Sequence, residues 1–268
     1  MKHGMLIPFI LLFAFGLPSS AEEAAPKHNW HFSASLEYST RSLDGTIVNK
    51  NALDNGAFGE LIATGDSMNV GNSDGVMVAA AVQYKRFGLG LNSLPTSFEG
   101  QGSALVAGSG SNAGVFLVTP LDTRIAVNML LANVYYNIVQ TPKTVFGIGL
   151  GFGRTSIDLS IVPEIGDALT YDGKQPFGFL NLHFSSTYKR FLYGFALNGI
   201  NGTFAGATVD YSDYKLNLGY RAIDSRVKLD IMGGYRLVNF AIDIDNAGDR
   251  VSADVSLEGP FLGVSFTY

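Results

Sequence analysis

The sequence of 268 residues contains no cysteine, so disulfide bonds, zinc–thiolate sites, thiol catalysis and a lipid-modified N-terminal cysteine are excluded. Charge is also scarce, because charged residues make up 15% of the chain against roughly 25% in an average soluble domain. With 47% hydrophobic residues, the chain is not intrinsically disordered. Its formal net charge of −5 and its lack of a basic stripe argue against nucleic acid as a partner.

Long hydrophobic runs are absent as well. The apolar stretch 5–17 is shorter than the ~20 residues that a membrane-spanning helix needs. Lys2 precedes this stretch, and Ser19 and Ala21 occupy the −3 and −1 positions of a cut after Ala21. The pattern predicts a cleavable secretory signal peptide at residues 1–21, followed by a single mature domain at residues 22–268. No later stretch is apolar for long enough to form a helical span.

What the sequence does contain is alternation with a period of two. Trp30, Phe32, Ala34, Leu36 and Tyr38 are separated from one another by polar residues, and similar windows begin near residues 146, 180, 214 and 229. Successive side chains of a β-strand point to opposite faces, so each strand has one apolar and one polar face. The pattern predicts an all-β protein.

The connections between these strands are of two kinds. Short turns are expected at 85–86, 140–143, 189–190 and 224–226, and longer connections at roughly 41–74, 100–120, 162–175, 201–208 and 246–253. Four turns and five longer connections join ten strands, with eight or twelve as the alternatives. This asymmetry is typical of transmembrane barrels, which have short periplasmic turns and long extracellular loops.

Two further observations favour lipid, rather than a soluble core, as the environment of the apolar face. The opposite face is rich in Gly, Ala, Ser and Asn, whereas a solvated outer surface normally carries many charges. Aromatic side chains gather where strands meet short turns, as the interface girdle of a membrane barrel requires. The expected girdle comprises Trp30, Tyr84, Phe87, Tyr188, Phe191, Tyr220 and Tyr268. We therefore predict an antiparallel up-and-down transmembrane β-barrel.

The chain stops on a strand in which Leu262, Val264, Phe266 and Tyr268 alternate with small or polar residues. This ending resembles the C-terminal assembly signal of Gram-negative outer-membrane β-barrel proteins. The resemblance is strong for the final seven residues and general for the remainder of the chain, and it does not identify a subfamily. It implies location in the outer membrane, contact with outer-membrane lipid and lipopolysaccharide, and delivery to the outer-membrane assembly machinery through the last strand.

The phase of the alternation changes at several points, for example between Phe152 and Ile157 and between Leu237 and Val238. Such a change indicates either a β-bulge or a strand that leaves the membrane for solvent. The sequence leaves both alternatives open.

The polar face of each strand is expected to line the lumen. The titratable residues on these faces are Glu37, His183, Lys215, Arg221, Lys228, Asp230 and Arg236. In a closed barrel the first and last strands are neighbours, which places Glu37 near Arg236. These charges form either a salt-bridge network that braces the interior or a polar constriction that selects solutes. The inward glycines between residues 147 and 153 leave room for bulky neighbours or for water.

Catalytic and metal sites are weakly supported. His183 and Ser185 imitate the base–nucleophile spacing of outer-membrane lipid hydrolases, but no orienting third group is apparent. The Asp pair and Asp–His pair of omptin-type surface proteases are not matched. The segment from Asp243 to Asp254 only partly matches a calcium loop. We predict no enzyme activity, no metal and no cofactor.

Two functions remain. The first is a narrow passive channel for small hydrophilic solutes, and the second is a closed structural or surface-interaction barrel that acts through its long connections. A lipid hydrolase is the least favoured. Solute identity and oligomeric state are left open.

Overall fold

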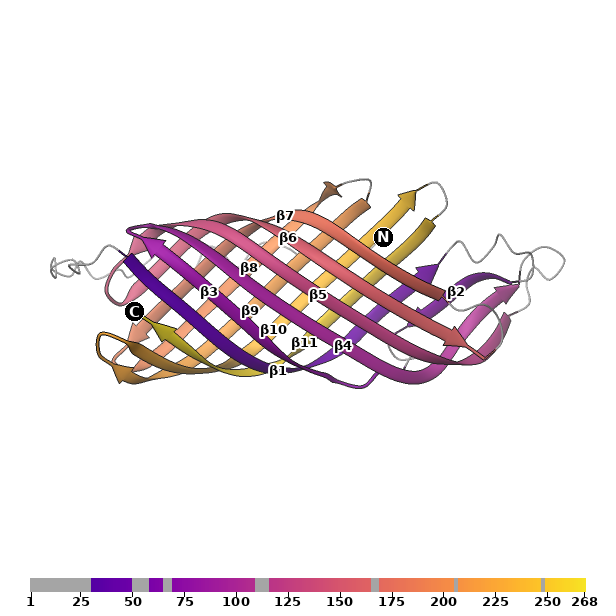
Figure 1. Cartoon of the computed structure of the whole chain (residues 1–268), viewed down its shortest axis with the longest axis horizontal. Helices are drawn as coiled ribbons and strands as arrows, with labels where there is room; N and C mark the ends of the chain where they lie inside the picture. Colours follow the sequence, from indigo (N-terminus) through magenta and orange to yellow (C-terminus); the bar gives the residue numbers. More distant parts are fainter. Residues whose placement is uncertain are drawn as a thin grey trace, which may run out of the picture.

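The computed structural model describes residues 30–49, 58–64, 69–108, 116–164, 169–204, 207–246 and 249–268. The expected signal peptide at 1–21 lies outside these residues. Within the described ranges, no helix is long and apolar enough to cross a membrane. The described chain consists instead of eleven strands joined into one antiparallel sheet (Figure 1).

The strands are long. The first six are β1 (Trp30–Asn49), β2 (Phe58–Thr64), β3 (Ser73–Tyr84), β4 (Phe87–Gly108), β5 (Phe116–Gln140) and β6 (Thr144–Pro163). The remaining five are β7 (Leu169–Tyr188), β8 (Phe191–Phe204), β9 (Ala207–Asp224), β10 (Lys228–Asn246) and β11 (Asp249–Thr267).

The sheet closes on itself because β1 pairs with β11, with Leu36 opposite Val264. β2 and β3 share one position in the wall: both pair with β1 on one side and with β4 on the other. The eleven strands therefore occupy ten positions around a barrel. This confirms the predicted fold, and full closure leaves no free sheet edge in the membrane-spanning part.

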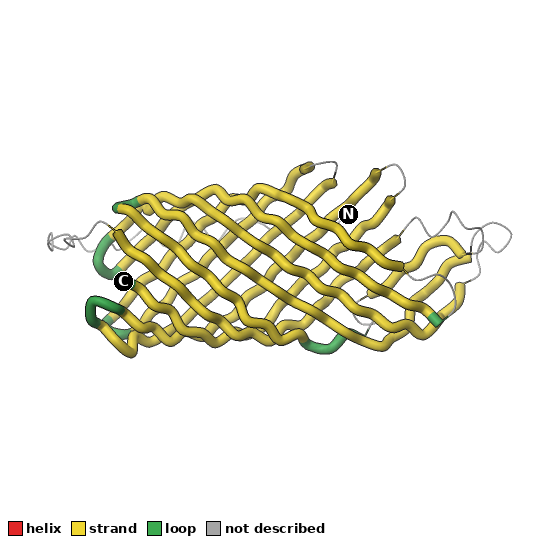
Figure 2. The backbone as a smooth tube through the Cα atoms, in the orientation of Figure 1, coloured by secondary structure: helices red, strands yellow, loops and turns green. Residues whose placement is uncertain are grey.

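The four short turns lie where the sequence predicts them, at one end of the barrel (Figure 2). Two of them contain a lysine in the left-handed region, Lys85 at a φ of 53° and Lys189 at a φ of 57°. By the asymmetry of membrane barrels, this end is the periplasmic one.

The sequence predicts five long connections, at 41–74, 100–120, 162–175, 201–208 and 246–253, and the structure corrects this prediction. Most of these residues are strand, since β4 runs to Gly108 and β6 to Pro163. The ladder continues far past the apolar outer band, so the barrel wall stands above the membrane. An alternation of opposite phase had hidden these strand extensions.

β5 shows the reason for the change of phase. In its lower half, Asn133 and Tyr135 point inward and Val134 points outward. In its upper half the same inward parity carries Ile125 and Met129, which are buried, while exposed polar and charged residues point outward. Odd-numbered side chains point inward along the whole strand, and only the environment on each side of the wall changes. The outside changes from lipid to water, and the inside from a polar lumen to an apolar core.

The phase changes noted in the sequence have the same origin. The pairing of β6 with β7 is regular from Phe152 through Ile157, and that of β10 with β11 is regular through Leu237 and Val238. No bulge occurs at either place. The strands leave the membrane there, which is the second of the two alternatives.

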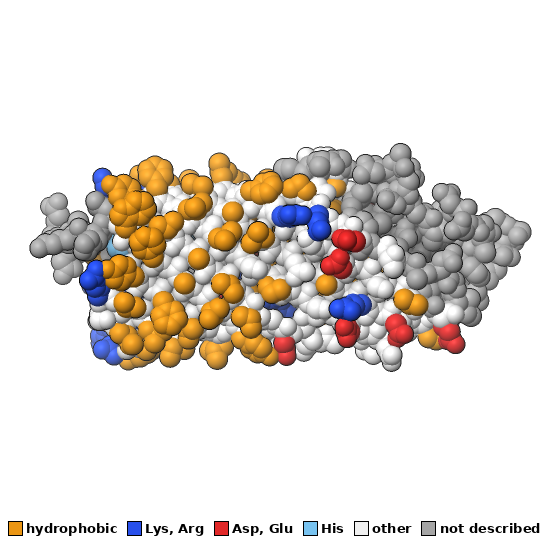
Figure 3. All heavy atoms as spheres, viewed as in Figure 1, with side chains coloured by type: hydrophobic (Ala, Val, Ile, Leu, Met, Phe, Trp, Pro, Cys, Tyr) orange, Lys and Arg blue, Asp and Glu red, His pale blue; other side chains and the backbone are white. Residues whose placement is uncertain are grey.

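The outer face follows this division (Figure 3). Hydrophobic side chains cover the part next to the short turns, and charged side chains appear in the part beyond it. Leu216 is 63% exposed and Ile231 is 46% exposed, as lipid-facing residues are when lipid is absent. Above this band, the interior is filled by an apolar core that includes Leu94, Phe98, Ile125, Val127, Met129, Ile161, Phe177, Val209, Tyr211, Val238, Phe240 and Leu257.

Candidate functional site

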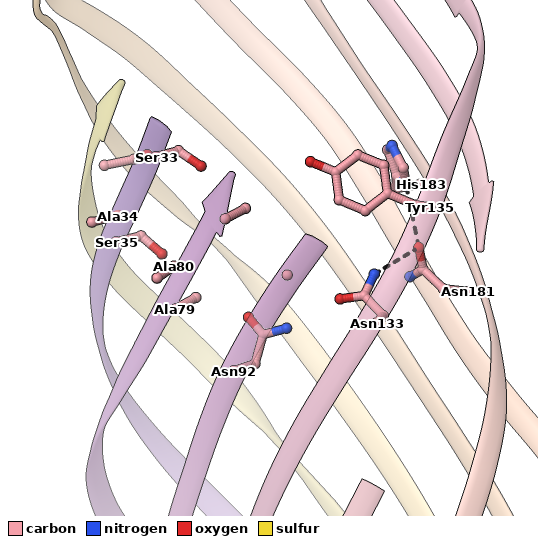
Figure 4. A pocket seen from close by; sticks show the side chains of 13 residues that line it. Ser33, Ala34, Ser35, Ala79, Ala80, Asn92, Asn133, Tyr135, Asn181 and His183 are labelled. Atoms are coloured by element: carbon pink, nitrogen blue, oxygen red, sulfur yellow. Dashed lines mark hydrogen bonds between the residues drawn. The ribbon is translucent and has the colours of Figure 1, made fainter. Parts of the chain in front are cut away.

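The barrel interior has three layers, and the layer nearest the short turns is a polar chamber of about 250 Å³. One of its walls carries Ser33, Ser35 and Asn92, and the facing wall carries Tyr135 and His183 (Figure 4). The lining is uncharged apart from the titratable histidine. A volume of this size holds several ordered water molecules, each of which occupies about 30 Å³ in liquid water.

A chain of amides links the chamber to the middle of the barrel. Asn181 donates to Oδ1 of Asn198 at 2.7 Å, and Asn198 donates to Oδ2 of Asp213 at 2.9 Å. Asn133 also donates to Asn181, at 3.4 Å. These side chains come from β5, β7, β8 and β9, so the chain of hydrogen bonds ties four strands together along one side of the inner wall.

His183 belongs to this chain. Its Nδ1 lies 3.2 Å from Oδ1 of Asn181, and its Nε2 lies 3.0 Å from Oδ1 of Asn137. The Nδ2 group of Asn137 is buried without a hydrogen-bond partner. Turning that amide over would let it donate to Nε2 of a neutral imidazole, whose Nδ1–H then donates to Asn181. Both ring nitrogens are therefore engaged by amides, and Ser185 makes no hydrogen bond to this ring within the described structure.

The middle layer is a cluster of buried charges. Arg236 makes a bidentate pair with Asp213, with Nε–Oδ1 at 2.8 Å and Nη2–Oδ2 at 2.7 Å. Lys215 on β9 reaches across the lumen to Glu37 on β1, with Nζ and Oε1 2.5 Å apart. Glu37 lies near Arg236, as the sequence predicts, since both line one cavity, but its ion-pair partner is Lys215. A cavity of about 140 Å³ lies beside this cluster.

Arg41 completes the cluster. The sequence predicts this residue at the start of the long connection 41–74. It is buried, and its Nη1 group donates to Oγ1 of Thr96 at 2.6 Å and to the carbonyl oxygen of Pro95 at 3.1 Å. The regular pairing of β3 with β4 ends at Ser93, so Arg41 supplies a donor where the ladder is interrupted. Arg41 and Asp213 are the charged members that the sequence reasoning missed. Arg41 points inward from β1 as Glu37 does, and Asp213 points inward from β9 as Lys215 does.

The other predicted lumen charges lie at the periplasmic rim. Arg221 pairs with Asp230, with Nε–Oδ1 at 2.8 Å and Nη2–Oδ2 at 3.2 Å. Lys228 is half-buried beside the last short turn. These residues belong to a separate ion-pair group near the mouth and do not join the central cluster.

The aromatic residues predicted at the membrane interface all lie at the same end, exposed on the outer wall. Trp30 packs against Tyr84 with ring centroids 4.7 Å apart, and Phe191 packs against Tyr220 at 5.7 Å. The remaining members, Phe87, Tyr188 and Tyr268, are equally exposed. The basic turn residues lie over these rings, with Nζ of Lys85 5.4 Å from the centroid of Tyr84.

The third layer is the apolar core, which lies above the charges. Phe177 is 0% exposed, and Phe98 and Phe240 are each 1% exposed. The ring of Tyr211 packs 4.9 Å from that of Phe177, and its hydroxyl donates to Asp213 at 3.2 Å. Tyr211 thus joins the apolar layer to the charged layer below it.

Comparisons with known proteins bear on the fold. No protein-family model matches the chain, and no curated protein matches it in sequence. The outer membrane protease OmpT from Escherichia coli has a similar structure, with a TM-score of 0.53 and 15% identity over 88% of this chain and 97% of that chain.

Two other outer-membrane barrels match with lower scores. The attachment invasion locus protein Ail of Yersinia pestis has a TM-score of 0.36 and 10% identity, over 88% of this chain and 99% of its own. The toluene transporter TodX of Pseudomonas putida has a TM-score of 0.33 and 13% identity, over 91% of this chain and 90% of its own. At these identities the likeness to OmpT shows the fold alone.

Proposed function

We propose that this chain is an outer-membrane β-barrel closed to solutes, which holds a rigid β-walled platform above the cell surface for structural or surface-interaction roles. The observation that carries the proposal is the apolar core in the outer half of the barrel. Phe98, Phe177 and Phe240 are shielded from water there, whereas the inner side chains of an open pore are wetted.

The energetic argument supports a permanent seal. A hydrated solute that passed through this layer would have to displace packed aromatic side chains, and each large aromatic contributes about 3–5 kcal/mol to stability when it is buried in a core. The charged layer beneath adds a second barrier, because Asp213 and Glu37 are already paired and their cations are held in place.

Conductance in planar lipid bilayers tests the proposal. The folded wild-type protein, whose insertion is verified by heat-modifiable gel migration, should produce no steady ion conductance. An open porin in the same bilayer serves as the positive control. Stable channel steps from the wild-type protein would refute closure and would favour the second candidate function.

That second candidate is a narrow channel for small hydrophilic solutes. The observation in its favour is the pair of cavities, of about 250 and 140 Å³, stacked below the apolar core. A channel would require the core to rearrange, so substitutions that shrink it should raise conductance in proportion to the volume removed. A wild-type protein that conducts, with such variants conducting more, would establish this function.

The outer membrane is the location that the barrel fold, the segment 1–21 and the aromatic C-terminal strand together support. We propose lipid and lipopolysaccharide as surroundings, and the outer-membrane assembly machinery as the partner of β11. Full-length protein should be recovered in the outer-membrane pellet. Truncation after Leu262, which removes the final aromatic residues, should instead leave unassembled protein in the periplasm.

The chain is proposed to be a non-enzyme despite its likeness in fold to a protease. Of its four histidines, His31 and His183 lie in the half of the wall next to the short turns, and His3 and His28 lie outside the described residues. His183 is held by two amides in the lumen. The purified protein should cleave neither peptides nor lipids, and activity that is lost in a His183→Ala variant would contradict this.

The platform is the part of the barrel wall above the apolar band. Its role can be tested by shortening the hairpin of β4 and β5. Ser103 lies opposite Pro120, so removing residues 104–119 and inserting a two-residue turn preserves the register of the remaining pairs. Cells that carry this variant should retain wild-type permeability and lose adhesion or envelope integrity. Unchanged adhesion and integrity would argue against a role for the platform.

A further inference from the structure

One basic spot interrupts the outer wall just above the apolar band, on β6 and β7. Along β6 the outward positions are Ile148, Leu150 and Phe152, all exposed and apolar, and the next outward residue is Arg154. Because Arg154 lies opposite Pro176 and Ser156 lies opposite Lys174, the side chain of Lys174 is the diagonal neighbour of Arg154 on the same face.

Neither cation has a carboxylate partner within 4 Å in the part of the chain that the structure describes. A third outward cation of the upper wall, Arg124, has one: its Nε lies 3.7 Å from Oε1 of Glu99. Arg154 and Lys174 are exposed, so their charges are directed at whatever surrounds the barrel at this height.

On β3 and β11, the first outward charge above the apolar band is acidic. Asp74 lies one outward position above Val76, and Glu258 lies two above Leu262. Hydrogen bonds from Thr40 and Tyr38 lower the pKa of Asp74, so that it stays ionised. Arg154 and Lys174 instead place two adjacent cations at this height, and together they attract anions.

We propose that Arg154 and Lys174 bind the phosphate of an outer-leaflet glycolipid of the lipid A type. The guanidinium presents two parallel donors to phosphate oxygens, and the ammonium adds a point charge beside it. Leu150 and Phe152 lie directly below and contact the acyl chains of the same molecule. Only a ligand with an anionic head and an apolar tail matches both parts, which favours a lipid over free phosphate.

Two carboxylates define the upper limit of the site. Asp158 lies opposite Asp172, one outward position further from the membrane than Ser156 and Lys174. They repel a phosphate that rises above Lys174 and so confine it to the membrane side. This inference concerns the outer wall, and it holds whether the lumen is closed or open.

The test is the binding of lipid A to the folded barrel in neutral detergent, followed by native mass spectrometry. Diphosphoryl lipid A should bind the wild-type protein, and the double variant R154A/K174A should bind it about 30-fold more weakly, since each cation near a membrane surface contributes roughly a factor of five. The variant D158N/D172N should bind it more tightly than wild type. Lipid A stripped of phosphate should bind the wild-type protein no more tightly than diphosphoryl lipid A binds the double variant.

R124A is the matched control, because it removes an exposed outward cation that already has an ion-pair partner. It should leave lipid A binding unchanged, and heat-modifiable migration verifies that every variant is folded. Equal affinity of wild type and R154A/K174A for diphosphoryl lipid A would overturn the proposal. Displacement of the lipid by equimolar inorganic phosphate would also overturn it, since the site would then recognise the anion without its tail.

Discussion

At the residue scale, the inward glycines of β6 are fitted to particular aromatic rings. A Cβ atom at Gly151 would overlap the ring of Phe179, and one at Gly153 would overlap that of Phe177. The sequence left two uses open for these glycines, bulky neighbours or water. The structure shows the first, because the two phenylalanines from β7 lie over the glycines of β6.

Gly151→Ala should therefore lower the free energy of unfolding by about 1–3 kcal/mol, as overpacking of a filled interior does. Gly233→Ala is the control: Gly233 lies on the outer side of β10, and its nearest neighbour would be 3.5 Å from the new Cβ, an ordinary contact. It should change stability by less than about 0.5 kcal/mol. Urea unfolding in detergent measures both, and equal effects would contradict the fit of glycine to ring.

The buried pair of Glu37 and Lys215 gives a second prediction at this scale. Lys215→Met leaves the buried Glu37 carboxylate without its ion-pair partner and should cost about 3–5 kcal/mol. The double variant E37L/K215M removes both charges and should recover most of that loss. A double variant as unstable as K215M alone would show that the pair is not the source of the effect.

At the scale of the strand, a single parity serves two opposite environments. β5 turns Asn128 outward above the apolar band and Val134 outward within it, without a bulge between them. The length of the strand is set by the continuous ladder, while the chemistry of each face is set by what lies beside it. A pattern of alternation therefore locates strands even where the apolar face turns inward.

This division predicts opposite outcomes for one substitution at two positions of β5. Val134→Lys places a charge in lipid and should destabilise the barrel by about 2–4 kcal/mol. Asn128→Lys places the same charge in water and should cost less than about 0.5 kcal/mol. The yield of heat-modifiable folded protein in lipid vesicles is the readout, and similar losses for both variants would place Asn128 inside the bilayer.

The sequence predicts the fold, the short turns and the inward parity of Glu37, Lys215 and Arg236, because each depends on local alternation. It does not predict which charges pair. Lys215 meets Glu37 across the lumen, from strands 178 residues apart in the chain, and that meeting depends on the tilt and register of the whole wall. The sequence predicts loops where the strands extend above the apolar band, because an apolar inner face is not typical of a membrane barrel with a polar lumen.

At the scale of the whole molecule, the barrel consists of two stacked parts that share one wall. The lower part is a membrane barrel with a polar lumen, and the upper part is organised like a soluble β-barrel with a dry core. The ion-pair cluster around Asp213 and Arg236 lies at the junction. The proposed seal thus comes from the upper part, and the membrane-facing band comes from the lower one.

Because the chain lacks cysteine, single cysteines report on this arrangement without background. The decisive measurement is the labelling rate of folded protein by a membrane-impermeant maleimide at two adjacent residues of β5. Asn128→Cys should react as a surface thiol, Val127→Cys should stay unlabelled until the barrel is unfolded, and Ser35→Cys in the periplasmic chamber should react. Labelling of Val127→Cys at a rate close to that of Asn128→Cys would mean that water fills the outer half, and would contradict the account.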